Sequence, residues 1–183
     1  MSDPVSALGG KTAEGFARVS EAGLTGMVTI RADLGGKALA KALKGLGLPV
    51  PGQRRIEGAG GRRIAWMSPD ELLLICDYAE APDLAAQLGA ALVKEHALVV
   101  DVSDARALMR VNGSKADQVL TKLCPVDFPL LPDGEIRRTR AAQVAVALWR
   151  SDEAEISLIC FRSVAGYVFD LLEVSARKGG ELS

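Results

Sequence analysis

The 183-residue chain has 49% hydrophobic and 25% charged residues and a formal net charge of −1, which is typical of a globular protein and not of a disordered one. The balanced charge excludes a generally basic nucleic-acid binder, and 4% aromatic residues are too few for base-stacking platforms. No apolar run approaches the roughly 20 residues of a membrane helix, and the N-terminus lacks the basic start and apolar core of a secretory signal. We therefore expect a cytoplasmic protein without membrane or nucleic-acid partners.

The first half of the chain is expected to form a β-α-β-β-α-β series over residues 25–102, after a loose N-terminal tail at 1–24. Alternating apolar residues indicate strands, apolar residues at helical spacing indicate helices, and Pro and Gly mark the breaks between them. The predicted strands are 27–33, 62–67, 71–76 and 97–102, and the predicted helices are 34–46 and 82–92, with a Pro/Gly/Arg loop at 49–61.

Between two apolar runs lies the tetrapeptide Ser68-Pro69-Asp70-Glu71. A serine beside two carboxylates could suggest a nucleophile, but a serine nucleophile requires a positioned base. Proline pre-sets φ for the second position of a β-turn, and Ser and Asp accept backbone hydrogen bonds around it. We therefore predict a hairpin turn.

The second half repeats the pattern over residues 103–177 as β-α-β-β-α, without a final strand. Ser114 and Asp117 resemble a capping box at the start of its first helix. The predicted strands are 105–111, 139–149 and 155–161, and the predicted helices are 116–123 and 164–172, with a proline-rich connection at 124–134 and a tail at 178–183.

The repeated order predicts the fold class. It is α+β, with two tandem ferredoxin-like split β-α-β units whose antiparallel sheets carry helices on one face. The halves share no sequence identity, so the repeat concerns architecture alone.

The cysteines and the histidine give little indication of a metal-binding or catalytic site. Cys76, Cys124 and Cys160 are far apart, and we expect buried reduced thiols. His96 is the one histidine in the sequence, so the close Cys or His spacing of zinc sites is missing, and it is expected at a helix end or in the core.

Two short stretches are more typical of turns than of ligand-binding or catalytic sites. Gly35-Gly36 matches neither of the glycine-rich nucleotide motifs, so a tight turn is expected. Asp101 and Asp104 flank Ser103 between two strands, where turn and capping roles are expected. The sequence therefore predicts no catalytic, cofactor-binding or metal-binding residue.

Arginines and tryptophans are the candidates for contact with a partner. Arginine doublets can lie in solvent or against an acidic partner surface. The second alternative is open because arginine is enriched at interfaces. Tryptophans at the ends of two similar strands favour core or interface packing. The doublets are Arg54-Arg55, Arg62-Arg63 and Arg137-Arg138, and the residues predicted at an interface are Trp66, Trp149, Arg137 and Arg138.

Three segments resemble the gamma subunit of heterotetrameric sarcosine oxidase: IAWMSPDELLLIC, VVDVSDARALMRVNGSKADQVLTKLCPVDF and ICFRSVAGYVFDLLEVSAR. The resemblance covers roughly residues 25–177. The middle segment also resembles, more distantly, the folate-binding aminomethyltransferase of the glycine cleavage system, which implies the fold of that enzyme. Where the transferase has acidic residues that engage folate and amine, this chain has Val144 and Ala145, so the fold is expected to be shared without the site.

The resemblance implies a non-catalytic structural subunit of a complex that oxidatively demethylates sarcosine to glycine and transfers the one-carbon unit to tetrahydrofolate. It implies alpha, beta and delta subunits as partners, and it assigns FAD, FMN, NAD, zinc and tetrahydrofolate to those subunits. Two alternatives stay open: a stand-alone folate-dependent or folate-sensing protein, and a ferredoxin-like small-molecule regulatory module.

Overall fold

The computed structural model describes residues 3–182 and divides into two compact units. The central unit is Leu24–Ser103, and the terminal unit combines the chain up to Gly23 with the chain from Asp104 onward. The predicted first unit, 25–102, lies within the central unit. Of the predicted second unit, 103–177, Ser103 belongs to the central unit, and the rest is only part of the terminal unit.

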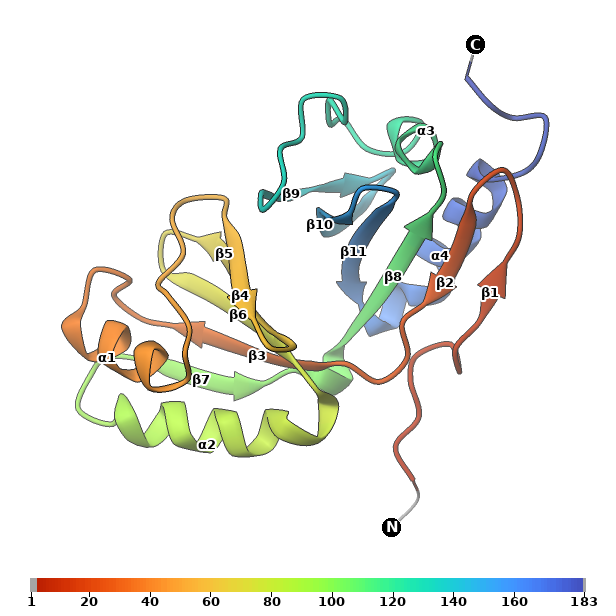
Figure 1. Ribbon diagram of the computed structural model, residues 1–183. Coiled ribbons are helices and arrows are strands. Elements are labelled where there is room, and N and C mark those ends of the chain that lie inside the picture. The colour runs from red at the N-terminus through yellow and green to blue at the C-terminus, as the bar shows by residue number, and fades with distance from the viewer. Residues whose placement is uncertain (1–2, 183) are drawn as a thin grey trace. The chain divides into compact units, whose positions relative to one another are not determined.

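The central unit contains a five-stranded antiparallel sheet in the order β4-β5-β6-β3-β7 (Figure 1). Without β4, this is the strand order of a split β-α-β fold, in which the first strand lies between the third and the fourth. The elements are β3 (Gly26–Arg31), α1 (Lys37–Gly45), β4 (Ile56–Ala59), β5 (Arg62–Ser68), β6 (Glu71–Cys76), α2 (Ala81–Ala91) and β7 (Leu98–Asp101).

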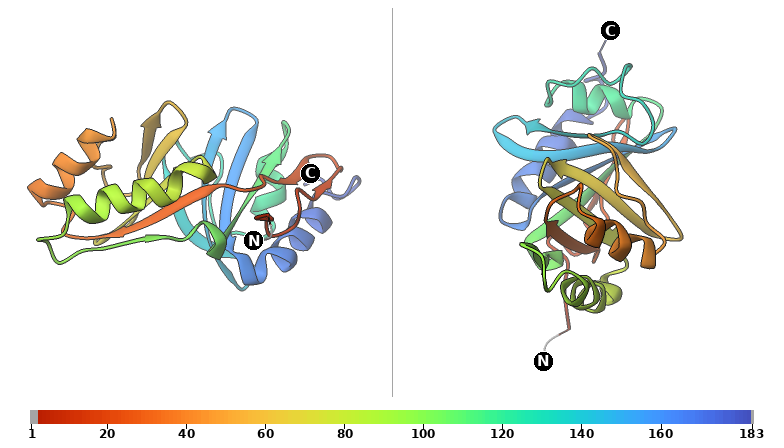
Figure 2. Two further views of the ribbon diagram at one scale, coloured as in Figure 1. Left: turned by 90° about the horizontal axis from the view of Figure 1, so that it is seen from below. Right: turned by 90° about the vertical axis from the view of Figure 1, so that its left-hand side faces the viewer.

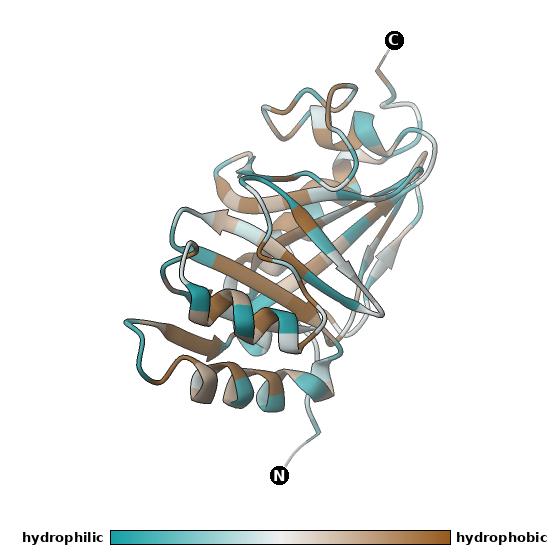
Figure 3. Ribbon diagram, turned by 60° about the vertical axis from the view of Figure 1, so that its left-hand side comes forward, coloured by the Kyte–Doolittle hydropathy of each residue, from teal (hydrophilic) through white to brown (hydrophobic). Residues whose placement is uncertain are grey.

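Both helices of the central unit cover the same face of its sheet (Figure 2). Leu39 of α1 and Leu88 of α2 join one buried cluster with Val28, Ile64 and Leu74 of the sheet. Polar and apolar residues alternate around both helices in Figure 3, as expected for helices with one face on a core. The central core therefore follows the predicted apolar spacing.

A six-stranded antiparallel sheet in the order β1-β2-β8-β11-β10-β9 forms the terminal unit. Its two helices contribute Leu120 and Leu172 to a second buried cluster, together with Met109 and Leu158 of the sheet. The elements are β1 (Thr12–Ala13), β2 (Arg18–Glu21), β8 (Arg106–Asn112), α3 (Ala116–Thr121), β9 (Ile136–Ala141), β10 (Val144–Asp152), β11 (Glu155–Phe161) and α4 (Ala165–Ser175).

The predicted loose tail at 1–24 is wrong for the residues that the structure describes. β2 pairs along β8, with Val19 opposite Val111, and Val19 is fully buried. β2 thus occupies the place of the final strand that the second repeat lacked in the sequence. At the other end, the predicted tail at 178–183 is anchored where Lys122 Nζ donates to the Gly180 carbonyl at 2.6 Å.

Two edge strands and one helix start differ from the predictions. The predicted strand at 139–149 is two strands, β9 and β10, joined by a turn in which Ala142 has φ +50°, and β4 lies in the predicted loop at 49–61. The predicted capping box is also wrong. Lys115 is the N-cap of α3, and Asp117 accepts two hydrogen bonds from Arg150 Nη2, both at 3.1 Å.

Within residues 3–182, every helix is too short or too polar to span a bilayer.

Candidate functional site

The Ser68–Glu71 stretch is a hairpin turn, as predicted. β5 ends at Ser68 and β6 begins at Glu71, and these two residues are paired in the ladder. Ser68 Oγ donates to Asp70 Oδ1 at 2.6 Å. This bond, helped by the charge of Arg31, holds the pKa of Asp70 below its usual value. The serine and the carboxylate are therefore used to build the turn.

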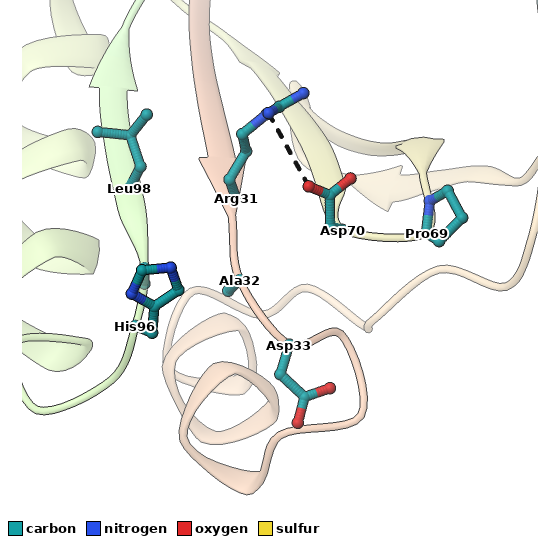
Figure 4. Close-up of a pocket in the computed structure, with 8 residues that line it drawn as sticks. Arg31, Ala32, Asp33, Pro69, Asp70, His96 and Leu98 are labelled. Carbon is teal, nitrogen blue, oxygen red and sulfur yellow. Dashed lines mark ion pairs between the residues drawn. The ribbon is translucent and has the colours of Figure 1, made fainter.

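A cleft of about 520 Å³ opens beside this turn (Figure 4). It is formed where three segments of the central unit meet: the end of β3, the β5–β6 turn and the start of β7. The lining residues are Arg31, Ala32, Asp33, Pro69, Asp70, His96, Ala97 and Leu98. This cleft is the candidate site, and none of its eight lining residues is a serine, threonine or cysteine.

Most charges around the cleft have structural partners. Arg31 Nη1 lies 3.9 Å from Asp70 Oδ2, and its Nη2 lies 3.3 Å from Glu71 Oε2. Asp33 Oδ1 accepts the backbone N–H of Gly35 at 2.9 Å, which confirms a turn at Gly35-Gly36. His96 is exposed at the rim and not in the core. The cleft therefore offers an imidazole and paired charges, but no nucleophile beside a base.

The side chains of Asp101 and Ser103 also form hydrogen bonds to the backbone. Asp101 Oδ1 accepts the backbone N–H of Ser103 at 2.9 Å and its hydroxyl at 2.5 Å, and Ser103 Oγ accepts the N–H of Met27 at 2.9 Å. These bonds hold the end of β7 to the start of β3. The predicted turn role is confirmed.

All three cysteines are buried free thiols, as expected. Burial raises the pKa of Cys76 and Cys160 to about 11 and that of Cys124 to about 12, which keeps them protonated near neutral pH. Residues 3–182 contain no group of three or more His, Cys, Asp or Glu side chains placed to bind one metal ion.

The residues predicted at an interface lie in both units. Trp66 of β5 is partly buried against the central core, whereas Trp149 of β10 is only 3% exposed. Arg137 and Arg138 lie on β9, the edge strand that pairs with β10. The Arg137 guanidinium pairs with Glu135, and Arg138 is exposed. Arg62, from another doublet, donates two hydrogen bonds of 3.0 Å to Glu80 and is thus used within the central unit.

Sequence reasoning missed the cleft because its residues come from separate segments. It also missed the exposure of β7, where Leu98 is 54% and Val100 40% exposed. The run LVVD by its composition predicts only a strand. The signal that was available is the absence of Lys and Pro from this strand, since such residues usually protect an exposed edge.

Val144 and Ala145, which the resemblance sets against acidic residues of the transferase, are both uncharged. Val144 is partly buried against the terminal core and Ala145 is exposed, both at the start of β10. Their ladder partners are Ala141 and Arg140. These residues cannot make the charge interaction that orients an amine.

Comparisons with known proteins point to one family. A family model described as sarcosine oxidase, gamma subunit family, matches residues 31–177. The chain is 37% identical over 130 residues to a sarcosine oxidase subunit gamma from Arthrobacter sp., which covers 70% of this chain and 63% of that protein. The chain thus spans less than two thirds of this relative.

Solved structures agree on the fold. A chain of heterotetrameric sarcosine oxidase from Corynebacterium sp. U-96, in complex with pyrrole 2-carboxylate, superimposes with a TM-score of 0.81 at 27% identity and covers 90% of this chain and 87% of that one. Glycine cleavage system aminomethyltransferase T from Bartonella henselae has a TM-score of 0.67 at 14% identity, over 86% of this chain and 45% of that one. The second likeness concerns the fold alone.

Proposed function

Because the chain belongs to the sarcosine oxidase gamma subunit family, we propose that it is a non-catalytic structural subunit of heterotetrameric sarcosine oxidase. In this proposal its partners are the alpha, beta and delta subunits. The assembled complex oxidatively demethylates sarcosine to glycine and transfers the one-carbon unit to tetrahydrofolate.

The observation that carries the proposal is the family match over residues 31–177, which includes parts of both units. The side chains support a structural role. The residues that could have suggested catalysis are used in turns and ion pairs: Ser68 with Asp70, Asp101 with Ser103, and Arg62 with Glu80.

The cofactors belong, in this proposal, to the other subunits. These would hold FAD, FMN, NAD, zinc and tetrahydrofolate, because this sequence carries no dinucleotide fingerprint and no phosphate-binding loop. The chain's three free cysteines suit a reducing compartment such as the cytoplasm.

Co-purification tests the proposal. The chain is tagged and expressed together with untagged alpha, beta and delta subunits, and the eluate is analysed by size-exclusion chromatography and flavin absorbance. We expect one flavin-containing complex that includes the chain. A soluble monomer that ignores the flavoprotein subunits would contradict the proposal and favour the stand-alone folate protein. Flavin bound to the chain alone would contradict the assignment of the flavins to the other subunits.

A further inference from the structure

Within residues 3–182, the outer side of β7 has no neighbouring strand. β7 is the last strand of the five-stranded sheet, and in this described part of the chain it pairs with β3 alone. Val102 N–H, just beyond it, donates to the Met27 carbonyl at 2.8 Å. Because bonded and non-bonded pairs alternate in an antiparallel ladder, Val100 and Leu98 also bond to β3. Val99 and Asp101 therefore direct their backbone N–H and C=O groups outward.

β7 differs from the other sheet edges in its side chains. β9 carries three arginines, a common protection against strand pairing, and β1 is only two residues long. β4 carries a charged Glu57 and a Gly58 that weakens a strand. β7 instead exposes Leu98 and Val100 on the face away from its helices, while Val99 packs on the central core. Figure 3 draws this strand mostly brown.

We propose that β7 accepts an extended segment of another subunit, which pairs with it as a sixth strand of the central sheet. The bonds would come from the outward backbone groups of Val99 and Asp101, and the specificity from apolar side chains against Leu98 and Val100. The four residues of β7 give about 13 Å of pairing. This inference rests on the proposed function, because it names the surface by which the subunit joins its complex.

Charge identifies the occupant as a different chain with a basic residue opposite Asp101. Residues 95–105 include Glu95, Asp101 and Asp104 but no Lys or Arg. A second copy pairing antiparallel through its own β7 would therefore place no Lys or Arg opposite Asp101. A partner segment with Lys or Arg at that position is complementary.

The cleft extends the same surface. Leu98 belongs both to the edge of β7 and to the cleft lining, where it follows His96 and Ala97 (Figure 4). A segment paired with the outer edge of β7 would thus reach the cleft at Leu98, whereas Arg31 and Pro69 lie on the other side of β7, toward β3 and the β5–β6 turn.

The test compares two variants of the full chain, each expressed with the alpha, beta and delta subunits. Leu98→Lys combined with Val100→Lys puts charge on the edge, and the matched control, Val93→Lys, changes an exposed apolar residue (77% exposed) outside β7. We expect the wild type and the control to elute with the subunits, and the double variant to bind about a hundredfold more weakly with an unchanged melting temperature. Equal binding by the double variant would overturn the inference while leaving the proposed function intact.

Amide hydrogen exchange gives a second readout that does not depend on the variants. In the wild-type complex, the Val99 and Asp101 amides should become protected, whereas the Val100 amide should already be protected in the chain alone. Unprotected Val99 and Asp101 amides in the complex would overturn the inference. A dimer of the isolated chain that the double variant abolishes would also overturn it and assign β7 to a second copy. If the wild type does not elute with the subunits, the proposed function fails as well.

Discussion

The carboxylate of Glu21 accepts a hydrogen bond from the backbone N–H of Gly10 at 2.7 Å. The same carboxylate accepts the N–H of Leu8 at 2.9 Å and the hydroxyl of Ser6 at 2.8 Å. Glu21 itself is only 6% exposed, at the end of β2. One buried acid therefore organises the segment that precedes the sheet of the terminal unit.

Replacement of Glu21 should destabilise the terminal unit. Glu21→Ala removes three hydrogen bonds to a charged acceptor and leaves two backbone donors without their partner, which should cost about 2–4 kcal/mol. Urea unfolding measures the loss. The matched control is Glu14→Ala, whose exposed side chain pairs with Arg18 and should cost less than about 1 kcal/mol. Equal losses in both variants would contradict the role of Glu21.

The turn at Asp70 should make stability depend on pH. Its pKa is lowered, chiefly by the hydrogen bond from Ser68, so the ionised form favours the folded chain. That stabilisation is present above the pKa of the unfolded residue, about 3.9, and is lost as the pH falls through the lower folded value. Asp70→Asn should therefore lower the urea midpoint at neutral pH and leave it unchanged in strong acid.

A double-mutant cycle with Ser68→Ala tests whether the Ser68 hydroxyl causes the stabilising effect of Asp70. If the Ser68 hydroxyl is responsible, the effect of Asp70→Asn should shrink in the Ser68→Ala background. Turnover of the assembled complex should hardly change. A hundredfold loss of turnover in an intact complex would restore a catalytic role for this turn.

The cysteines should be inert in the folded chain. Cys124 is buried and its pKa of about 12 leaves almost no thiolate at neutral pH. Cys76 and Cys160 should behave in the same way. Titration with a disulfide reagent should detect the thiols slowly in buffer and all three at once in denaturant. Rapid reaction of any thiol in buffer would contradict this burial.

Trp149 should act on folding more than on association. At 3% exposure it has little surface to offer a partner, and Trp149→Ala should cost about 3–5 kcal/mol of unfolding free energy. The tryptophan-to-phenylalanine change should cost less, since it keeps most of the ring volume. Thermal unfolding of the isolated chain measures both. A Trp149→Ala chain that melts like the wild type but loses its partners would make Trp149 an interface anchor.

Trp66 and the Arg137-Arg138 pair stay the interface anchors to test. Trp66 is partly buried, and both arginines lie on an edge strand. Alanine at a true anchor should weaken association by about 2 kcal/mol or more and leave the melting temperature near that of the wild type. Arg177→Ala, which changes an exposed arginine outside all three arginine doublets, is the control for loss of charge. Binding to immobilised partner subunits measures the effect, and unchanged affinity would remove these residues from the interface.

Local patterns in the sequence determined most of the elements. The hairpin at Pro69-Asp70 was predictable because proline and aspartate favour a turn whatever surrounds them. The helix α1 ends as predicted, where Gly47 adopts φ +74°, a conformation that glycine takes without strain. The split β-α-β order followed from these elements, and so did the fold class.

The edge strands could not be predicted in this way. β4 and β9 carry Glu57, Gly58 and three arginines, so they lack the apolar alternation that marks a strand. The ladders with β5 and β10 make them strands, and that partnership is absent from their own composition. The turn between β9 and β10 was missed because Ala142 adopts a positive φ without the Gly or Asn usual there.

The completion of the second repeat depends on pairing between distant parts of the chain. The apolar patterns predict a β-α-β-β-α unit without its last strand, but they do not show that Arg18–Glu21 supplies this strand from the other end of the chain. The same holds for the cleft, where Arg31, Asp70 and His96 meet from three segments. Both cases have the same cause. Periodicity shows which residues are apolar along one element, whereas pairing across the chain depends on which strand edges and side chains stay open once the cores have formed.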